Sequence, residues 1–431
     1  MSRASIGVHR RSRSGGGERV PALLAQGRIG QAACQVVEAL RLSEAVLTDR
    51  PYDEVAQVAA DIHGACGVSH VCASLQATEA ALGISVSEQT TLLRRLTMNA
   101  EVMSSHALRV YFLAAPDFLI VDGLIPLVPE NRQLLKRAFR LKQTAEELCR
   151  LVGRGQSGAT ALAPGGFTKL PTMDQLGSME RRLMDLRDHV QYAVELYQSF
   201  EVPEFERPTQ HVCLKQADHY GFYGGELTVG DGRGLSAEEY VEAIAEDLSV
   251  QSTAERAKGR GSNAMVGALA RVNNKWDRLC AEAQDVAEAL GLRAPCNNPL
   301  MNPVAQVVEL VHCVEESIGL IDQILSYGPN EEPEPLIAAR ASRGIGMVDA
   351  PRGVLVHDYT YDHEGRTTQV NILTPTAQSL DGLGADMRAY MAELNGETED
   401  EIRRRRAMLV RAYDPCTSCS TPHPQRGALT N

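Results

Sequence analysis

Residues 411–423 read RAYDPCTSCSTPH and contain two cysteines, Cys416 and Cys419, that are separated by two residues. A turn of this length can direct both thiolates toward one metal ion, but such a pair supplies only half of a four-ligand site. Far upstream, residues 61–70 read DIHGACGVSH and repeat the same gap between His63 and Cys66. The two segments together offer three thiolates and one imidazole.

This ligand set restricts the chemistry of the site. Soft thiolates with one imidazole suit zinc, iron or nickel, whereas magnesium and calcium prefer oxygen ligands. A structural zinc site, a disulfide and a catalytic metal centre are all compatible with the spacing. Structural zinc usually joins two short pairs within a small module. Here most of a 431-residue chain separates the pairs, which favours a catalytic metal.

Composition excludes several classes of protein. The net charge of -12 argues against a nucleic-acid-binding surface, and no apolar run is long enough to span a bilayer. Residues 1–18, with clustered arginines and three consecutive glycines, predict a disordered tail before one domain over residues 19–431. Scattered cysteines predict buried, reduced thiols and a cytoplasmic protein. The cysteines meant here are Cys149, Cys213, Cys280, Cys296 and Cys313.

Hydrophobic periodicity predicts a mainly helical chain. We expect helices over residues 71–83, 87–113, 131–153, 173–199, 275–290 and 303–327, and one charged helix from 379 to 406. Short strands are expected over residues 205–235, and two strands with a turn at 362–365 over residues 354–373. The predicted fold is therefore α+β, with long helices around a buried metal site and small peripheral sheets.

The two cysteine segments resemble the motifs of a known protein family. Residues 411–419 are similar to the C-terminal cysteine motif of the large subunit of nickel-iron hydrogenases. The N-terminal motif of that family reads Arg-x-Cys-Gly-x-Cys followed by Ser-His, and Cys66, Ser69 and His70 match it. Asp61 and His63 stand where the family has the arginine and the first cysteine, so the motif is divergent here.

A third segment, residues 349–353, reads DAPRG and resembles the Glu-Ala-Pro-Arg-Gly pattern of the family, with Asp349 in place of the glutamate. The resemblance implies that Pro351 and Arg352 cover the metals and that Asp414 is the partner of the Arg352 guanidinium. Such a pairing would offset the cost of burying an arginine. His70 is expected beside the bound cofactor.

The resemblance also implies a ligand set. Cys66 and Cys419 would bridge nickel and iron, and Cys416 would be a terminal nickel ligand. The iron would carry cyanide and carbon monoxide. His63 would replace the other terminal thiolate and is a candidate base. Because imidazole is neutral and less polarizable than thiolate, we expect a shifted redox potential or lost turnover.

Further positions refine this expectation. Glu44 and His423 match residues that bind a second, hard metal ion such as magnesium, near the C-terminus. Pro21 stands where the family has a glutamate implicated in proton transfer, and proline cannot relay a proton. Ser105 occupies a position where cytosolic members carry serine and membrane-bound members carry aspartate, which favours the cytosolic, cofactor-coupled branch.

The function implied by the resemblance is that of an oxidoreductase, the large subunit of a nickel-dependent hydrogenase. Dihydrogen would be cleaved heterolytically at a nickel-iron centre, and electrons would pass to a small subunit with iron-sulfur clusters. Maturation proteins would supply the metals and diatomic ligands. Two alternatives stay open: a scaffold for assembly of the iron-cyanide-carbonyl fragment, and a zinc-stabilised interaction protein.

Overall fold

The computed structural model describes residues 4–6, 22–25, 28–32, 42–62, 64–120, 132–153, 160–230, 232–248, 255–259 and 264–416. His63, Cys419, His423 and Pro21 therefore lie outside the described residues. Within the predicted tail, β1 (Ala4–Ile6) pairs antiparallel with β2 (Ala22–Ala25), which pairs with β3 (Arg28–Ala32). Most of residues 1–18 is not described, so the disorder and the domain boundary stay predictions.

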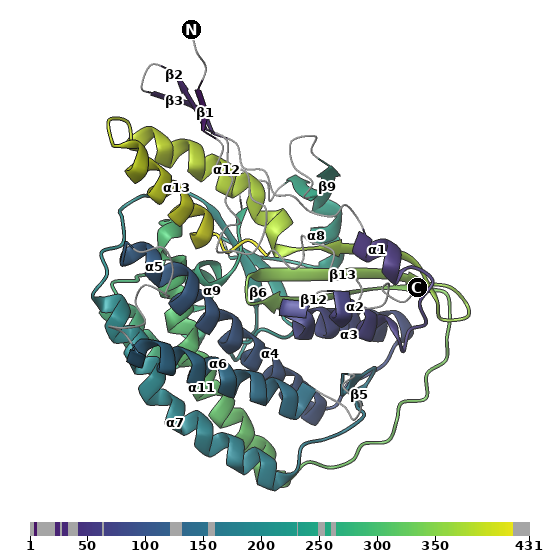
Figure 1. Ribbon diagram of the computed structural model, residues 1–431. Helices are drawn as coiled ribbons and strands as arrows, with labels where there is room; N and C mark the ends of the chain where they lie inside the picture. The colour runs from purple at the N-terminus through teal and green to yellow at the C-terminus, as the bar shows by residue number, and fades with distance from the viewer. Residues whose placement is uncertain are drawn as a thin grey trace, which may run out of the picture.

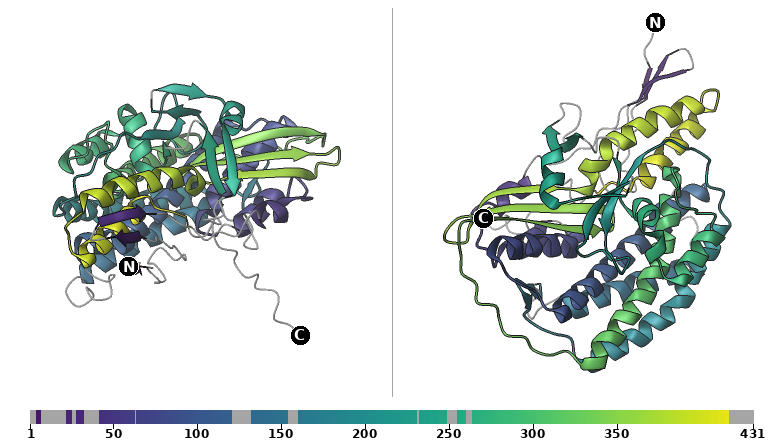
Figure 2. Two further views of the ribbon diagram at one scale, coloured as in Figure 1. Left: turned by 90° about the horizontal axis from the view of Figure 1, so that it is seen from above. Right: turned by 180° about the vertical axis from the view of Figure 1, so that it is seen from behind.

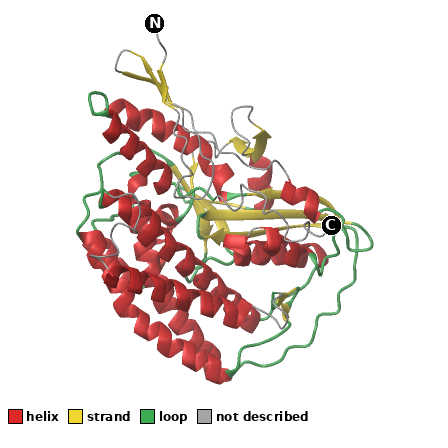
Figure 3. Ribbon diagram, in the orientation of Figure 1, coloured by secondary structure: helices red, strands yellow, loops and turns green. Residues whose placement is uncertain are grey.

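Four long helices form a bundle on one side of the molecule (Figures 1 and 3). They are α4 (Glu88–Leu108), α6 (Arg132–Gly153), α7 (Met173–Gln198) and α11 (Asn302–Tyr327). α4 packs against α6 and α11, and α7 packs against α6 and α11. Each helix buries an apolar face in the shared core, as the periodicity predicted.

Local signals explain where these helices begin and end. The Ser87 side chain accepts a hydrogen bond from the Thr90 backbone at the start of α4, and a capping box formed by Thr172 and Gln175 starts α7. Instead of ending at residue 108, the α4 segment continues as a π-helix, η2 (Arg109–Ala114). Such wide turns inside helices are frequent at functional sites.

A three-stranded antiparallel sheet lies beside the bundle, with strands β12 (Ser342–Ala350), β13 (Gly353–Tyr361) and β14 (Thr367–Leu373). Helix α3 (Gly67–Leu82) packs against β12 and β13, and Figure 2 shows this arrangement from two further directions. The predicted end of α3 at Gly83 is confirmed, because this residue has a left-handed backbone with φ 72°. The helix begins earlier than predicted, directly after Cys66.

Two glycines let α3 approach the sheet closely. A Cβ atom added to Gly344 would lie 2.1 Å from the Ala77 carbonyl oxygen, and one added to Gly346 would lie 2.1 Å from the Ala73 carbonyl oxygen. These separations are far below van der Waals contact, so the packing of α3 on β12 requires glycine at both positions.

A second sheet contains β6 (Gln210–Lys215), β7 (Glu226–Val229), β8 (Arg233–Leu235) and β11 (Ala264–Met265) in the order β11-β6-β7-β8. The remaining elements are short: α1 (Leu42–Leu47), α2 (Val55–Ile62), η1 (Gly64–Cys66), α5 (Ala115–Phe118), β4 (Leu162–Ala163), β5 (Gly166–Phe167), α8 (Ala237–Ala243), β9 (Ile244–Leu248), β10 (Glu255–Gly259), η4 (Trp276–Arg278) and η5 (Pro299–Met301).

Two helix predictions need correction. The single helix predicted over residues 379–406 is wrong, because the chain forms α12 (Pro375–Glu393) and α13 (Glu399–Ala412). Gly396, with φ 103°, turns the chain between them, and the Thr398 side chain caps the second helix. The predicted 275–290 helix is replaced by α9 (Ala268–Lys275) and α10 (Ala281–Ala289).

The predicted fold class is confirmed: the chain is α+β, mostly helical, with small sheets. The predicted state of the scattered cysteines is also found in part. All five are free thiols; Cys213 and Cys313 are buried, whereas Cys149, Cys280 and Cys296 are partly buried.

Candidate metal centre

Two thiols from opposite ends of the chain meet in the interior. The Sγ atoms of Cys66 and Cys416 lie 3.9 Å apart, and both residues are buried, with exposed fractions of 5% and 2%. Cys66 ends η1 and is the N-cap residue of α3, whereas Cys416 follows the end of α13. The predicted convergence of the two cysteine segments is therefore present for these two residues.

The separation of these sulfurs fits metal binding better than a disulfide. Bonded sulfurs lie about 2.05 Å apart, so 3.9 Å excludes a disulfide between Cys66 and Cys416. Two thiolates bound to one metal at about 2.3 Å with a tetrahedral angle would be about 3.8 Å apart. The donor pair therefore fits a thiolate-bound metal without rearrangement.

Arg352 lies beside one of the two thiols, that of Cys416. It is in the turn between β12 and β13; its Nη1 donates to Cys416 Sγ at 3.6 Å and its Nε donates to Asp414 Oδ1 at 3.0 Å. The predicted pairing of Arg352 with Asp414 is thus found. A guanidinium remains charged at any physiological pH, so it stabilises negative charge on the Cys416 sulfur.

Asp414 is held by more partners than the sequence indicated. Arg109, the first residue of the π-helix η2, forms an ion pair with its Oδ1, and Gln306 donates to its Oδ2 at 2.9 Å. Asp414 also has a left-handed backbone, with φ 50°, which is unusual for a residue with a side chain. The backbone of Cys416 donates to Thr376 Oγ1 at 2.9 Å. These contacts fix the chain that leads into Cys416.

A buried group of charged and polar side chains, which we call the ionic cluster, contacts the turn that carries Arg352. Its members are Arg271, Lys275, Glu309, Asp349, His106 and Tyr220. All five N–H groups of Arg271 have acceptors: both carboxylate oxygens of Glu309, Asp349 Oδ1, and the carbonyl oxygens of residues 350 and 351. Arg271 thus binds the two peptide carbonyls directly before Arg352.

Charges within the ionic cluster are strongly coupled. Burial would raise the pKa of Glu309, but the charge of Arg271 and its hydrogen bonds lower it well below the ordinary value. Burial lowers the pKa of His106, against the opposite effect of Glu309. The carboxylate is therefore ionised and the imidazole neutral at pH 7.

A carboxylate occupies the N-terminus of α3. Glu101, from α4, accepts hydrogen bonds from the backbone N–H of Val68 at 2.8 Å and of Ser69 at 3.0 Å, and from the Ser69 hydroxyl. Burial raises the pKa of Glu101 from 4.5 to about 7, although these hydrogen bonds lower it. Two N–H groups of the first helical turn, where the helix attracts negative charge, are thus bonded to Glu101.

The other predicted site residues divide into two groups. His70 and Pro351 are both buried. His70 follows Cys66 by four residues on α3, and its Nδ1 lies 2.9 Å from His357 Nε2. Pro351 precedes Arg352, and its carbonyl oxygen accepts a hydrogen bond from Arg271. Glu44 belongs to α1, which lies beside β14, and its Oε1 accepts a hydrogen bond from the backbone N–H of Ile372 at 3.1 Å.

Three of the predicted ligands, His63, Cys419 and His423, lie outside the described residues, so ligation by the complete set stays a prediction. Within the described part of the chain, no three Cys, His, Asp or Glu side chains gather closely enough to hold a metal ion. None of the described helices combines the length and apolarity of a membrane span.

Several residues of the site were missed in the sequence. Arg109, Glu101 and Arg271 each lie in a helix, where a single charged residue is usually solvated and gives no signal of its own. Their burial, at 3%, 6% and 0% exposure, comes only from tertiary packing. A charged residue inside an otherwise apolar helical face would have been the one available hint.

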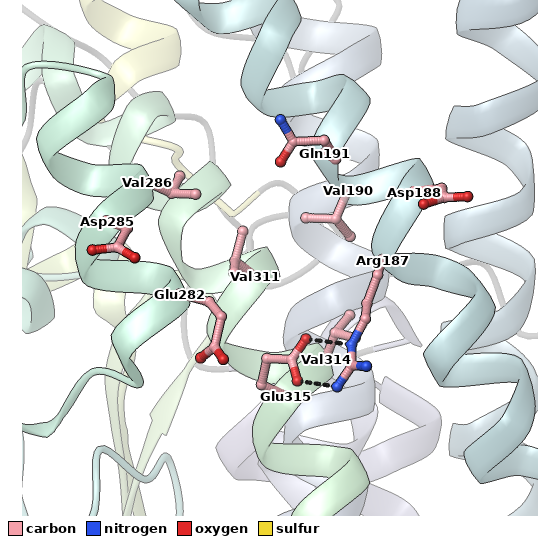
Figure 4. Close-up of a pocket in the computed structure, with 10 residues that line it drawn as sticks. All are labelled: Arg187, Asp188, Val190, Gln191, Glu282, Asp285, Val286, Val311, Val314 and Glu315. Carbon is pink, nitrogen blue, oxygen red and sulfur yellow. Dashed lines mark hydrogen bonds and ion pairs between the residues drawn. The ribbon is translucent and has the colours of Figure 1, made fainter.

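An open groove of about 540 Å³ lies elsewhere, between α7, α10 and α11 (Figure 4). Valines form part of its lining, and Arg187 spans it to pair with Glu315 at 2.6 Å. None of the candidate site residues lines this groove.

Comparison with known proteins agrees with this geometry. A family model described as nickel-dependent hydrogenase matches residues 41–147. The alpha subunit of sulfhydrogenase 1 from Pyrococcus furiosus is 30% identical over 387 residues, which cover 89% of this chain and 90% of the relative. One subunit of the F420-non-reducing hydrogenase from Methanothermobacter marburgensis is 27% identical, over 88% of this chain and 86% of that relative.

A solved structure gives the same result. The chain is similar to the crystal structure of an NAD+-reducing [NiFe]-hydrogenase in the H2-reduced state, with a TM-score of 0.85, 25% identity and coverage of 98% and 99% of the two chains. The protein belongs to the nickel-dependent hydrogenase family. Within that family it is a large, or alpha, subunit.

Proposed function

We propose that this chain is the subunit of a nickel-iron hydrogenase that oxidises dihydrogen reversibly and passes the electrons to a small subunit with iron-sulfur clusters. The observation that carries the proposal is the pair of buried thiols, Cys66 and Cys416, 3.9 Å apart, with the Arg352 guanidinium beside Cys416. A nickel-iron centre would supply the Lewis acidity and the redox capacity that heterolytic cleavage of dihydrogen requires.

The residues of this chain would hold and tune that centre. Cys66, Cys416 and Cys419 would be thiolate ligands, with His63 as the fourth ligand. Arg352 would place a permanent positive charge beside the Cys416 sulfur, and Asp414 would orient Arg352 through the 3.0 Å hydrogen bond. Pro351 would exclude water from the same side, because the residue is buried.

The neutral His63 leaves the ligand set with one negative charge fewer than four thiolates would give. We infer that this raises the reduction potential of the centre or slows turnover. Glu44 and His423 would bind a second, hard ion such as magnesium. Cyanide and carbon monoxide on the iron, delivered by maturation proteins, and a cytoplasmic location in the cofactor-coupled branch complete the proposal.

The test is to express the chain together with its small subunit, using its own maturation genes, and to measure nickel, iron and the infrared bands of cyanide and carbon monoxide. Nickel and iron in comparable amounts, with those bands and hydrogen uptake, are the expected result. A Cys416→Ser variant is the matched control, since it removes one thiolate while keeping the size of the side chain, and it should lose nickel.

Two other outcomes would replace the proposal. Iron with diatomic ligands but without nickel would indicate a scaffold for cofactor assembly, an alternative favoured by His63 in place of a ligand cysteine. Zinc without iron would indicate a zinc-stabilised interaction protein.

A further inference from the structure

Two exposed surfaces of opposite charge lie on the outside of the helix bundle, and the proposed function uses neither of them. The first is the open groove between α7, α10 and α11, which we call the surface groove (Figure 4). The second is the solvent face of the first half of α6. Their chemistry and their positions match each other.

The floor of the surface groove is apolar. Four valines line it, and two of them, Val286 and Val311, are partly exposed to solvent although they lie between packed helices. The other two are Val190 and Val314, which are buried beneath them. An apolar floor inside a charged rim is typical of a site that another side chain covers.

The rim of the surface groove is acidic. Four carboxylates and one guanidinium line the groove, so its formal charge is -3. Arg187 is paired with Glu315. The other three carboxylates form no ion pair within the described part of the chain; they are Asp188 on α7 and Glu282 and Asp285 on α10. Figure 4 shows the α10 pair and Asp188 on opposite sides of the valines.

The first half of α6 is basic. Residues 132–145 contain five cationic side chains and no acidic one, on a chain whose net charge is -12. Arg132, Lys136 and Arg140 follow one another at intervals of four, so they lie along one face of the helix. All three are exposed, and none forms an ion pair within the described residues. We call these three residues the basic stripe.

An aromatic ring is exposed beside the basic stripe. Phe139 is 57% exposed and follows Lys136 by three residues, which places it on the same helix face. Its ring contacts that of Phe112 edge-on, with 5.3 Å between the centroids, so the ring is held in place while much of it faces solvent. Aromatic and arginine side chains are enriched at the centres of protein interfaces. The stripe and this ring therefore have the composition of a binding surface.

The basic stripe and the surface groove lie on the two sides of α7, at the same level along it. α7 packs against both α6 and α11. Arg137, within the range of the stripe, donates to the carbonyl oxygen of Asp188 at 2.8 Å, and Asp188 lines the groove. The stripe and the groove are therefore separated only by the width of α7.

This placement matches two-fold symmetry. A rotation of 180° about an axis parallel to α7, on its outer side, exchanges the two sides of α7 and keeps the level along it. The stripe of one copy then faces the groove of the other at two equivalent contacts, as an isologous dimer requires. Met184, 41% exposed and one helical turn before Asp188, would meet its own counterpart near the axis.

We propose that this chain forms a two-fold symmetric dimer in which the basic stripe and Phe139 of each copy occupy the surface groove of the other. Three cations meet three unpaired carboxylates at each contact, and the aromatic ring covers the valines. At physiological salt, charges more than about 8 Å apart are largely screened, so these close pairs outweigh the overall negative charge of the two copies. The inference is independent of the proposed function, because no proposed metal ligand takes part.

The first measurement is sedimentation equilibrium of the purified full chain at low and at high salt. We expect a dimer whose dissociation constant rises with salt concentration, since salt screens the pairs at its rim. A chain that stays monomeric at protein concentrations up to about 100 μM, a weak affinity for a specific interface, would overturn the inference and leave the surface groove to a different partner.

Charge reversal tests which surfaces meet. The stripe variant combines Lys136→Glu with Arg140→Glu, and the groove variant combines Glu282→Lys with Asp285→Lys. All four side chains are exposed, so both variants should fold. Each should dimerise at least about 100-fold more weakly than the wild type, because like charges face each other at both contacts.

Two exposed residues outside both surfaces supply the matched controls. Lys169→Glu and Glu364→Lys reverse a charge of each sign before α7 and in the turn after β13. Both should dimerise within about threefold of the wild type, because screening removes the effect of distant charges. Equal weakening in controls and test variants would show that net charge alone governs association, and would overturn the inference.

A mixture of the two test variants gives the most specific result. In a mixed dimer the reversed stripe faces the reversed groove, and the other contact pairs a native stripe with a native groove. Both contacts are attractive again, so the mixture should dimerise within about tenfold of the wild type. A mixture that stays monomeric would show that the stripe and the groove do not meet.

The apolar part of the contact has its own test. Phe139→Ala should weaken the dimer at least about tenfold, as loss of an interface anchor does, while the salt dependence of the dissociation constant stays unchanged. A dimer that survives both Phe139→Ala and the two charge reversals forms through another surface, which would also overturn the inference.

Discussion

Two fully buried regions of the molecule are built from different chemistry. One is the ionic cluster beside the Arg352 turn. The other lies between α3 and β13; we call it the polar row, and its members are His70, Ser74, Thr78, His357, Tyr359 and Tyr361. In the ionic cluster, Arg271 and Lys275 balance Glu309 and Asp349. In the polar row, imidazoles and hydroxyls bond to one another. Paired charges fix geometry, because separating them is costly. A hydrogen bond between uncharged groups contributes less, about 0.5–1.5 kcal/mol.

Breaking the ionic cluster should have the largest effect. Arg271→Met leaves Glu309 and Asp349 with one cation between them, and loss of a buried partner costs about 3–5 kcal/mol. We expect the free energy of unfolding in urea to fall by this amount. The stability of Arg271→Lys, which keeps the charge but cannot fill five acceptors, should lie between Arg271→Met and the wild type. A loss below about 1 kcal/mol in Arg271→Met would contradict the comparison.

Glu101 is an intermediate case, a buried carboxyl whose pKa is raised from 4.5 to about 7. The folded chain binds its proton more tightly than the unfolded chain, so this stabilisation is complete below about pH 4.5 and is lost as pH rises through about 7. The free energy of unfolding should therefore decrease over this range by up to about 3 kcal/mol.

The measurement is urea unfolding of the wild type and of Glu101→Gln at several pH values. The variant imitates the protonated carboxyl, so the Glu101 contribution to the slope should disappear. Parallel curves for the two proteins would show that Glu101 does not titrate in this range.

Removing a single hydroxyl from the polar row should lower the free energy of unfolding by less than removing Arg271 does. Tyr361→Phe leaves the Thr78 hydroxyl without its partner at 2.8 Å, which costs about 1–2 kcal/mol. Thermal or urea unfolding of this variant, compared with the Arg271 variants, measures the contrast between the two regions directly. A loss as large as that of Arg271→Met would remove the distinction.

The smallest effect is expected at the surface groove. The Arg187 side chain is 52% exposed where it pairs with Glu315, and exposed ion pairs contribute less than about 1 kcal/mol. Arg187→Gln should therefore unfold within that margin of the wild type. This variant also serves as the control for Arg271→Met, because it removes an exposed arginine instead of a buried one.

The sequence predicted the elements with strong patterns and the cysteine segments with clear motifs. α11 and α7 follow from apolar periodicity, and the meeting of Cys66 with Cys416 follows from motif resemblance, although 350 residues separate them. A break such as the one at Gly396 was missed because the surrounding residues continue a charged helical pattern.

Partners of single charged residues could not be predicted in the same way. Arg109 reaches Asp414 only because η2 packs near the end of α13, and Glu101 reaches the start of α3 only because α4 lies beside it. Such contacts depend on the three-dimensional arrangement of elements, which no local pattern encodes.

Gly344 and Gly346 have a role that reaches beyond packing. Because these two residues have no side chain, the backbone of α3 lies directly on β12. They therefore set the distance between the helix and the sheet. The same helix carries Cys66 at its start and His70 one turn later. A methyl group added at either glycine would therefore tilt or lift α3 and displace the proposed ligand Cys66 together with His70.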